Sequence, residues 1–200
     1  MPNKEGKKLI EFNCKNGVYA VNDAVNPLGY LVSITLDKNL STKDIYGDGE
    51  LQLSVLSDKG MTGSLEMTAR DDEFEVALGF IKEILGGIAD IQALENKKID
   101  IGYETYILTK DGVTKTKKVW LLGVQVSPES DSLSQNTDTT NEATASYGIT
   151  VTGKNLKASG GTDDFVDENG NTLKVFKISA LPTDEGYATF LDTVPTPTAK

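Results

Sequence analysis

The residues that most enzymes use for acid–base or nucleophilic chemistry are scarce in this sequence. It contains no histidine, so a serine or cysteine nucleophile cannot be paired with an imidazole base. Cys14 is the only cysteine, and its place in an expected strand indicates a small packing residue. A phosphate-binding loop of the GxxxxGK[ST] type is also missing. We therefore expect no enzymatic activity.

One acidic segment, residues 163–170, could in principle gather oxygen ligands. Its members are Asp163, Asp164, Asp167, Glu168, Asn169 and Gly170. An EF-hand loop needs oxygen ligands at its first and twelfth positions, and in the register that fits best these are Phe165 and Phe176. We interpret the segment as a solvated hairpin, and we expect no metal and no cofactor. A glycosidase built on two carboxylates stays open as an alternative, because distances in space cannot be read from the sequence.

The composition favours one turn-rich domain. A chain of 200 residues can bury roughly 70% of its unfolded surface. Its net charge of −10 lacks the basic surplus with which free nucleic-acid-binding proteins displace counterions. No apolar run suggests a signal peptide or a membrane span, and a single cysteine fits a reducing compartment. We expect a soluble protein that is made in the cytoplasm and has no membrane partner.

The clearest local pattern is a strand followed at once by a helix. Residues 61–70 alternate between apolar and polar types, which predicts a strand with one buried face. The period then changes, and the apolar positions are Phe74, Ala77, Leu78, Ile81, Ile84 and Leu85. This spacing predicts an amphipathic helix from Asp71 to Leu85, with acidic residues in its first turn and Gly86 as its C-terminal cap.

Most other segments indicate strands and turns. Strands are expected at Phe12–Val21, Tyr30–Leu36, Ile99–Ile107, Lys118–Val126, Ala143–Val151 and Leu173–Ile178, a turn at Asn26–Pro27, hairpins at Asp111–Gly112 and Asn169–Gly170, and a short helix from Pro182 to Pro195. We therefore predict a mainly β fold, an antiparallel β-sandwich or barrel with one flanking amphipathic helix and a short C-terminal helix. Residues 1–9 would form a flexible lead, 10–180 the domain and 181–200 the helix with a proline-rich tail.

Residues 37–59 predict a long loop between two strands, and this loop is unusually apolar. The side chains concerned are Ile45, Tyr46, Leu51, Leu53, Val55 and Leu56. Long excursions of this kind are uncommon unless they are functional or disordered. We expect the segment to order against another surface, such as a second subunit.

Two expected strands carry a small, hydroxyl-rich face opposite their apolar face. On the first strand this face comprises Thr62, Ser64, Glu66 and Thr68, and on the second Thr144, Ser146 and Thr150. Faces of this kind are typical of the solvent-exposed side of a β-sandwich.

The order and character of several segments resemble a known family. The segments are Ile45-Tyr46-Gly47-Asp48 with the strand and helix of residues 60–85, the Ser/Thr-rich loop and strand of residues 130–152, Asn16–Val21, and the closing stretch Asp184–Pro195. Together they resemble the major tail proteins of long-tailed phages and prophages of Gram-positive bacteria. Residues 154–170 have no assigned place in that pattern, and the resemblance includes no catalytic signature.

The resemblance implies a tail-tube fold and a structural role in the virion. Subunits of such proteins form hexameric rings whose sheets join around a lumen, and the rings stack into a tube through which DNA passes at ejection. It implies that residues 37–59 reach a neighbouring ring, and that tape-measure, tail-tip and tail-terminator proteins are partners. Our hypothesis is that the two hydroxyl-rich faces line the lumen. The alternatives are a soluble carbohydrate-binding β-sandwich and the tube protein of a related bacterial injection system.

Overall fold

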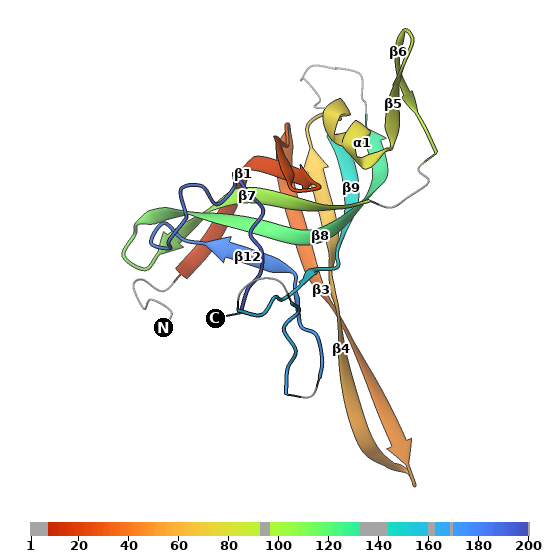
Figure 1. Cartoon of the computed structure of the whole chain (residues 1–200), viewed down its shortest axis with the longest axis vertical. Helices are drawn as coiled ribbons and strands as arrows, with labels where there is room; N and C mark the ends of the chain where they lie inside the picture. The colour runs from red at the N-terminus through yellow and green to blue at the C-terminus, as the bar shows by residue number, and fades with distance from the viewer. Residues whose placement is uncertain (1–7, 93–96, 133–143, 160–162, 169, 200) are drawn as a thin grey trace, which may run out of the picture.

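A computed structural model describes residues 8–92, 97–132, 144–159, 163–168 and 170–199. It is dominated by one antiparallel sheet of eight strands in the order β2-β1-β7-β8-β9-β4-β3, with β12 paired to β8 (Figure 1). The elements are β1 (Lys8–Val21), β2 (Ala24–Pro27), β3 (Leu31–Gly47), β4 (Glu50–Met67), α1 (Asp72–Leu78), β5 (Ile81–Ile84), β6 (Gly87–Asp90), β7 (Lys98–Thr109), β8 (Thr114–Ser132), β9 (Thr144–Val151), β10 (Lys154–Asn155), β11 (Lys174–Val175) and β12 (Lys177–Ala180). The predicted mainly β, antiparallel fold is confirmed.

The sheet forms two layers because the two halves of strand β8 belong to different layers. Its first half pairs with β7 and β12, and its second half pairs with β9. Between the halves, Gly123 has a φ of 62°, and a Cβ there would lie 2.7 Å from the carbonyl oxygen of Gly153. Only glycine combines this backbone conformation with so close an approach. The strand bends at this point, so β9, β4 and β3 fold over β1 and β7 as a sandwich.

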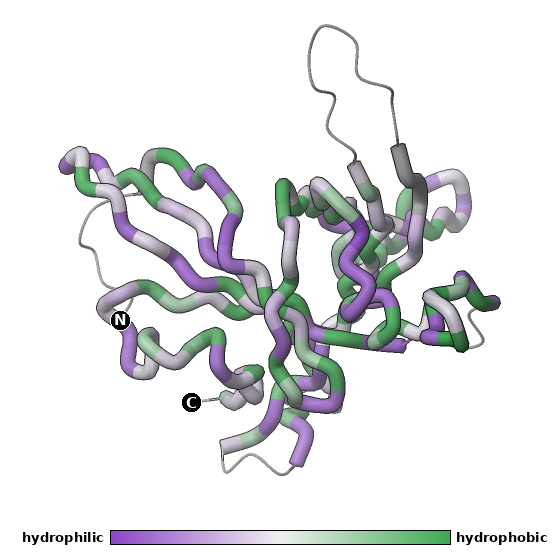
Figure 2. Tube along the Cα trace, turned by 90° about the horizontal axis from the view of Figure 1, so that it is seen from above, coloured by the Kyte–Doolittle hydropathy of each residue, from purple (hydrophilic) through white to green (hydrophobic). Residues whose placement is uncertain are grey.

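The main core fills the space between the two layers. Leu65 and Met67 from β4 meet Phe74 from α1, and the ring of Phe74 packs edge-on against Tyr19 and Tyr147. Figure 2 shows hydrophobic and hydrophilic residues alternating along the strands, as expected for sheets buried on one face. The apolar face of β4 therefore packs against the apolar side of α1.

A second, smaller core explains why β8 is apolar on both faces. Trp120 and Leu122 point away from the main core and pack with Ala20 and Leu191. The indole Nε1–H of Trp120 donates a hydrogen bond of 2.7 Å to the carbonyl oxygen of Phe190. The C-terminal segment thus covers the outer face of β8, and this part of the strand is buried on both faces.

The predicted helix is much shorter than expected. Its start is correct, because the Asp71 carboxylate accepts a hydrogen bond of 3.2 Å from the backbone N–H of Phe74. Its end is wrong, because Gly79, with a φ of 83°, closes the helix after Leu78. Residues 81–84 instead form β5, which pairs with β6 across a turn at Gly86. Leu85, expected in the buried stripe, is fully exposed.

The short C-terminal helix is also wrong, since residues 181–194 form successive turns. Side chains of β8 take the carbonyl groups that a helix would use internally. The Lys118 ammonium donates to the carbonyl oxygens of Tyr187 and Ala188 at 2.9 and 2.8 Å, and Trp120 takes that of Phe190. The apolar residues of the segment still pack inward, but from turns.

The first hairpin turn lies earlier than predicted. Asn22 and Asp23 both have positive φ values, 50° and 65°, as a two-residue type I′ turn requires. Pro27, expected in the turn, is instead the last residue of the edge strand β2. Proline has no backbone N–H, and at this position no hydrogen bond of the sheet requires one. The predicted Asp111–Gly112 hairpin is confirmed between β7 and β8, with the Gly112 N–H bonded to the carbonyl oxygen of Thr109.

A buried ionic network attaches α1 to the sandwich. Glu75 is 2% exposed and accepts hydrogen bonds from the Arg70 guanidinium and from the Tyr147 hydroxyl. Arg70 also forms an ion pair of 2.9 Å with Asp90 at the end of β6. One carboxylate therefore holds the helix, the main core and the β5–β6 hairpin together.

We predict that Glu75→Ala lowers the free energy of unfolding by about 3 kcal/mol, because removing one partner leaves a buried hydroxyl and part of a guanidinium without their acceptor. Urea unfolding of the monomer, followed by tyrosine and tryptophan fluorescence, measures this. Glu73→Ala is the matched control, since Glu73 is exposed on the same helix, and it should cost less than about 1 kcal/mol. Equal effects of the two substitutions would contradict a stabilising role of the network.

Candidate assembly surfaces

The segment predicted as a long loop is a β-hairpin arm. Residues 38–59, which we call the arm, are the distal parts of β3 and β4, and they are paired from Leu40↔Asp58 to Gly47↔Glu50. Figure 1 shows the arm projecting far beyond the rest of the molecule. The prediction of a long loop is wrong, because Asp48 and Gly49 form a tight hairpin turn with φ values of 52° and 84°.

Both edges of the arm are free. The pairing of β9 with β4 ends at Met61↔Val151, and β3 pairs only with β4. Within the residues that the structure describes, no other strand lies beside the arm. A free two-stranded ribbon is marginally stable in water, and its unpaired edges are templates for pairing with another chain.

Both faces of the arm are apolar. Directly opposed residues share a face, so the register places Ile45 with Leu53 and Lys43 with Val55 on one face, and Tyr46 with Leu51 and Thr42 with Leu56 on the other. The six predicted contact residues have exposed fractions between 43% for Ile45 and 67% for Tyr46. The described residues of the chain therefore cover neither face of the arm.

The predicted hydroxyl-rich residues come together on one outward face. Thr62 lies opposite Thr150, Ser64 opposite Gly148 and Glu66 opposite Ser146. Thr144 continues the same face of β9, and Thr68 follows directly after β4. The face extends onto β3 as Ser33, Thr35 and Asp37 and onto β8 as Gln125 and Ser127. The structure thus joins two separate sequence patterns into one surface across four strands.

This hydroxyl-rich face is mildly acidic. Among the residues just named, Asp37 and Glu66 are acidic and none is basic. The Ser33 hydroxyl donates a hydrogen bond of 2.9 Å to Glu66 Oε2, across the β3–β4 pair. The alternate residues Leu65, Tyr147 and Ile149 are buried in the main core. The face is therefore a flat, polar surface on a rigid support, with negative charge at two points.

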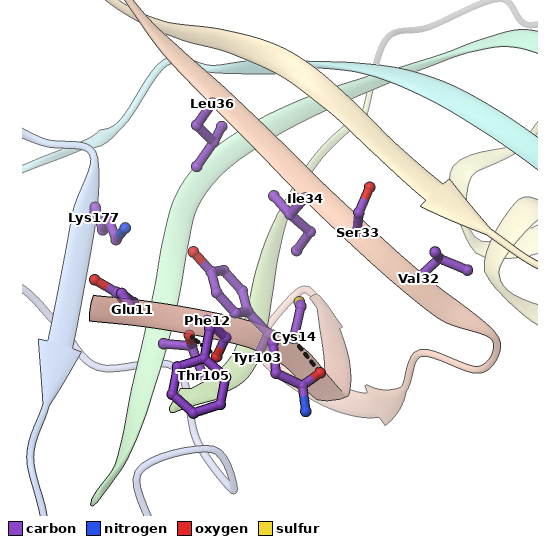
Figure 3. A pocket seen from close by; sticks show the side chains of 11 residues that line it. Glu11, Phe12, Cys14, Val32, Ser33, Ile34, Leu36, Tyr103, Thr105 and Lys177 are labelled. Atoms are coloured by element: carbon purple, nitrogen blue, oxygen red, sulfur yellow. Dashed lines mark hydrogen bonds between the residues drawn. The ribbon is translucent and has the colours of Figure 1, made fainter. Parts of the chain in front are cut away.

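A groove that the sequence did not reveal lies between β1 and β3 (Figure 3). It has a volume of about 460 Å³. Its lining is Glu11, Phe12, Asn13, Cys14, Val32, Ser33, Ile34, Leu36, Tyr103, Thr105 and Lys177. Residues 11–14 of β1 lie outside the part of β1 that pairs with β2, and β1 and β3 are not paired with each other. No sequence pattern could have predicted it, because it depends on where two distant strands stop.

The described part of the acidic segment, residues 163–170, is a connecting segment held by hydrogen bonds. Asp164 forms an ion pair of 2.7 Å with Lys157 and accepts a hydrogen bond of 2.7 Å from Asn155. These hydrogen bonds lower the pKa of the Asp164 carboxyl. Among the described residues, no three acidic or cysteine side chains are grouped as a metal site. Asn169, part of the predicted hairpin, lies outside the described residues.

The groove contains the chain's only thiol, which is half-buried. Burial raises the pKa of Cys14 to about 11, against about 8.5 for a free thiol. The thiolate is the reactive form, and a higher pKa leaves less of it at pH 8. A thiolate of higher pKa is also a stronger nucleophile, but this gain in reactivity is smaller than the loss from the lower thiolate population.

We predict that iodoacetamide alkylates Cys14 in the folded monomer at pH 8 at least roughly tenfold more slowly than in the urea-unfolded chain. The rate should rise steadily as the pH approaches 11. Mass spectrometry of the Cys14 peptide over time measures it. A rate that levels off near pH 8.5 would show that the thiol is solvated and the groove is open at that point.

The longest segment described as a helix has 7 residues, too few to cross a bilayer. No protein-family model and no curated protein matches this chain. Among solved structures, a chain in a cryo-EM structure of the anti-feeding prophage (AFP) baseplate, 6-fold symmetrised, is similar with a TM-score of 0.35 and 7% identity, over 67% of this chain and 85% of that chain. A likeness of this degree carries no conclusion about function.

Proposed function

We propose that this chain is a structural protein that polymerises as stacked hexameric rings into a phage tail tube. The observation that carries the proposal is the arm, which is apolar on both faces and which no other described segment of the chain covers or pairs with. Burying such a surface requires another protein. The resemblance of the sequence to major tail proteins suggests that this protein is a copy of the same chain in the next ring.

The free outer edge of β3 supports ring formation. An open sheet edge is an aggregation hazard unless it is covered or paired. A contact between different surfaces of identical chains closes into a ring when the rotation between neighbours permits it. Six chains that join their sheets in this way would turn six open edges into one continuous wall.

The hydroxyl-rich face suits the wall of a DNA channel. DNA that slides during ejection must not be held by basic side chains, since these bind phosphates by releasing counterions. Thr62, Ser64 and Glu66 present short hydroxyls and one negative charge instead. In the proposed tube the face made by β4 and β9 points into the lumen, and DNA passes without specific binding.

A tail tube also implies partner proteins and a location in the virion. Tape-measure, tail-tip and tail-terminator proteins would contact the tube, which is assembled in the bacterial cytoplasm and becomes part of the virion. A carbohydrate-binding module, the alternative of another class, would use exposed aromatic rings, whereas the only tryptophan, Trp120, is fully buried. The tube of a bacterial injection system would use the same surfaces.

Negative-stain electron microscopy of the purified protein tests the proposal. We expect rings or tubes on the order of 100 Å wide, the size for six domains of this mass around a channel. A strictly monomeric protein at every concentration and salt condition would overturn the proposal.

The matched variant lacks residues 46–56, replaced by a short Gly-Ser linker. Its monomer should unfold at nearly the same denaturant concentration, because these side chains make no contact with the main core. It should form no tubes. Tubes of normal length from this variant would show that the arm does not join rings.

We further predict that a reconstruction of the tube places Glu66 on the channel wall. The Glu66→Lys variant should still fold, because the side chain is exposed, and its tubes should retain short DNA duplexes at low salt that wild-type tubes release. Lys38→Glu serves as a charge-change control on the arm. Density for Glu66 on the outside of the tube would end the hypothesis that this face lines the lumen.

A further inference from the structure

We propose that the groove between β1 and β3 is the docking site for the arm of a second copy of this chain. This inference rests on the tail-tube function proposed above and names the surface that receives the arm. The groove is formed by residues of β1, β3, β7 and β12 of a single chain, so it is present before any partner binds.

The groove has apolar side chains on both sides that could contact an arm. Figure 3 shows Cys14 and Tyr103 on one side of the groove, across from Ile34 on the other, whereas the ring of Phe12 turns to the other face of β1 and packs on Tyr106. The outer edge of β3 from Ser33 to Lys38 is regular and unpaired. In the proposed ring this edge pairs with a neighbouring subunit, so the arm would engage the groove through alternate side chains and not as a strand added to β3.

The area of the arm is small compared with that of a stable interface. Eight residue rises along two paired strands span roughly 26 by 10 Å, or about 250 Å² for each face. A stable interface buries about 800 Å² on each partner. One face falls far short of this area, and both faces together, about 500 Å², do so as well, so the groove supplies one part of an interface that further contacts between copies complete.

Charge favours the same pairing. The chain carries a net charge of −10, whereas the arm, with three lysines and four acidic residues, carries −1. The charged residues in the groove lining are Glu11 and Lys177, which cancel. Copies of an acidic chain repel each other, so a contact between its two nearly neutral parts meets the least repulsion.

The occupant cannot be the chain's own arm. Strand β3 supplies both a wall of the groove, at Val32 to Leu36, and one strand of the arm, from Leu40 to Gly47. The strand runs continuously from one to the other, and the arm leads away from the groove (Figure 1). The arm that fills the groove must therefore come from another copy.

Cysteine cross-linking to the native Cys14 tests this docking. The reporters are Ser54→Cys and Ser57→Cys, two near-isosteric changes at exposed positions on opposite faces of the arm. Assembled protein is oxidised at pH 9, to offset the weak ionisation of Cys14, and a parallel sample is treated with a short bis-maleimide, which tolerates longer separations than a disulfide. We expect at least one reporter to give covalent ladders on non-reducing gels, with Cys14 in the linked peptide.

Two controls separate the outcomes. Adding Cys14→Ser should remove the ladder and leave at most dimers linked from arm to arm. Leu85→Cys at the tip of the β5–β6 hairpin, which is fully exposed, should give no link to Cys14, and a link there would show that this hairpin fills the groove instead. Tubes that form without any link from either reporter overturn the docking and leave the tail-tube function standing. A protein that neither assembles nor cross-links overturns both.

Discussion

The bend of β8 at Gly123 is the constraint on which the arrangement of the other elements depends. Because the strand turns there, its first half belongs to the layer of β7 and its second half to the layer of β9. Within the first half, successive side chains alternate between two cores, with Val119 and Leu121 in the main core and Trp120 and Leu122 in the smaller one. The same bend brings β3 back over β1 without joining them, and this incomplete closure creates the groove.

The open sheet edges favour association between copies of the chain, although one arm contact alone contributes little free energy. Covering both faces of the arm, on the order of 500 Å², would gain roughly 10 kcal/mol at most from apolar burial. Association costs roughly 4 to 15 kcal/mol in lost motion and ordering. A single arm contact is thus close to balance. Several contacts made at once, within a ring and between rings, add to each other because only the first carries the full entropic cost.

Alternation along the chain was sufficient to predict the strands that have one buried face. Residues 99–107 and 144–151 lie in β7 and β9 as expected, because each alternate side chain enters the core. The arm was misjudged for the opposite reason. It has no buried face, so the alternation of Leu51, Leu53 and Val55 has no counterpart on β3, where the apolar residues are irregularly spaced.

The helices failed because the competing contacts lie far away in sequence. Ile81 and Ile84 continue the helical spacing, yet Gly79 ends the helix first and Arg70 holds the next hairpin through Asp90. Residues 182–195 have the spacing of a helix, but Lys118 and Trp120 bind its carbonyl groups. The hydroxyl-rich residues could be named from their own strands, whereas their union on one face required the register between β4 and β9.

The base of the arm is where one pair of strands changes from a sheet with a buried face into a free ribbon. At Gly60 a Cβ would lie 2.1 Å from the carbonyl oxygen of Val151, the last residue of β9, so β9 stops where β4 must pass closely over it. A register shift between Lys38 and Leu40 accompanies this step. A bulge of this kind places one extra residue on one strand and increases the local twist. The direction of the arm is therefore set at its base, independently of the hydroxyl-rich face, and the same two strands can present a polar surface in one direction and an apolar one in another.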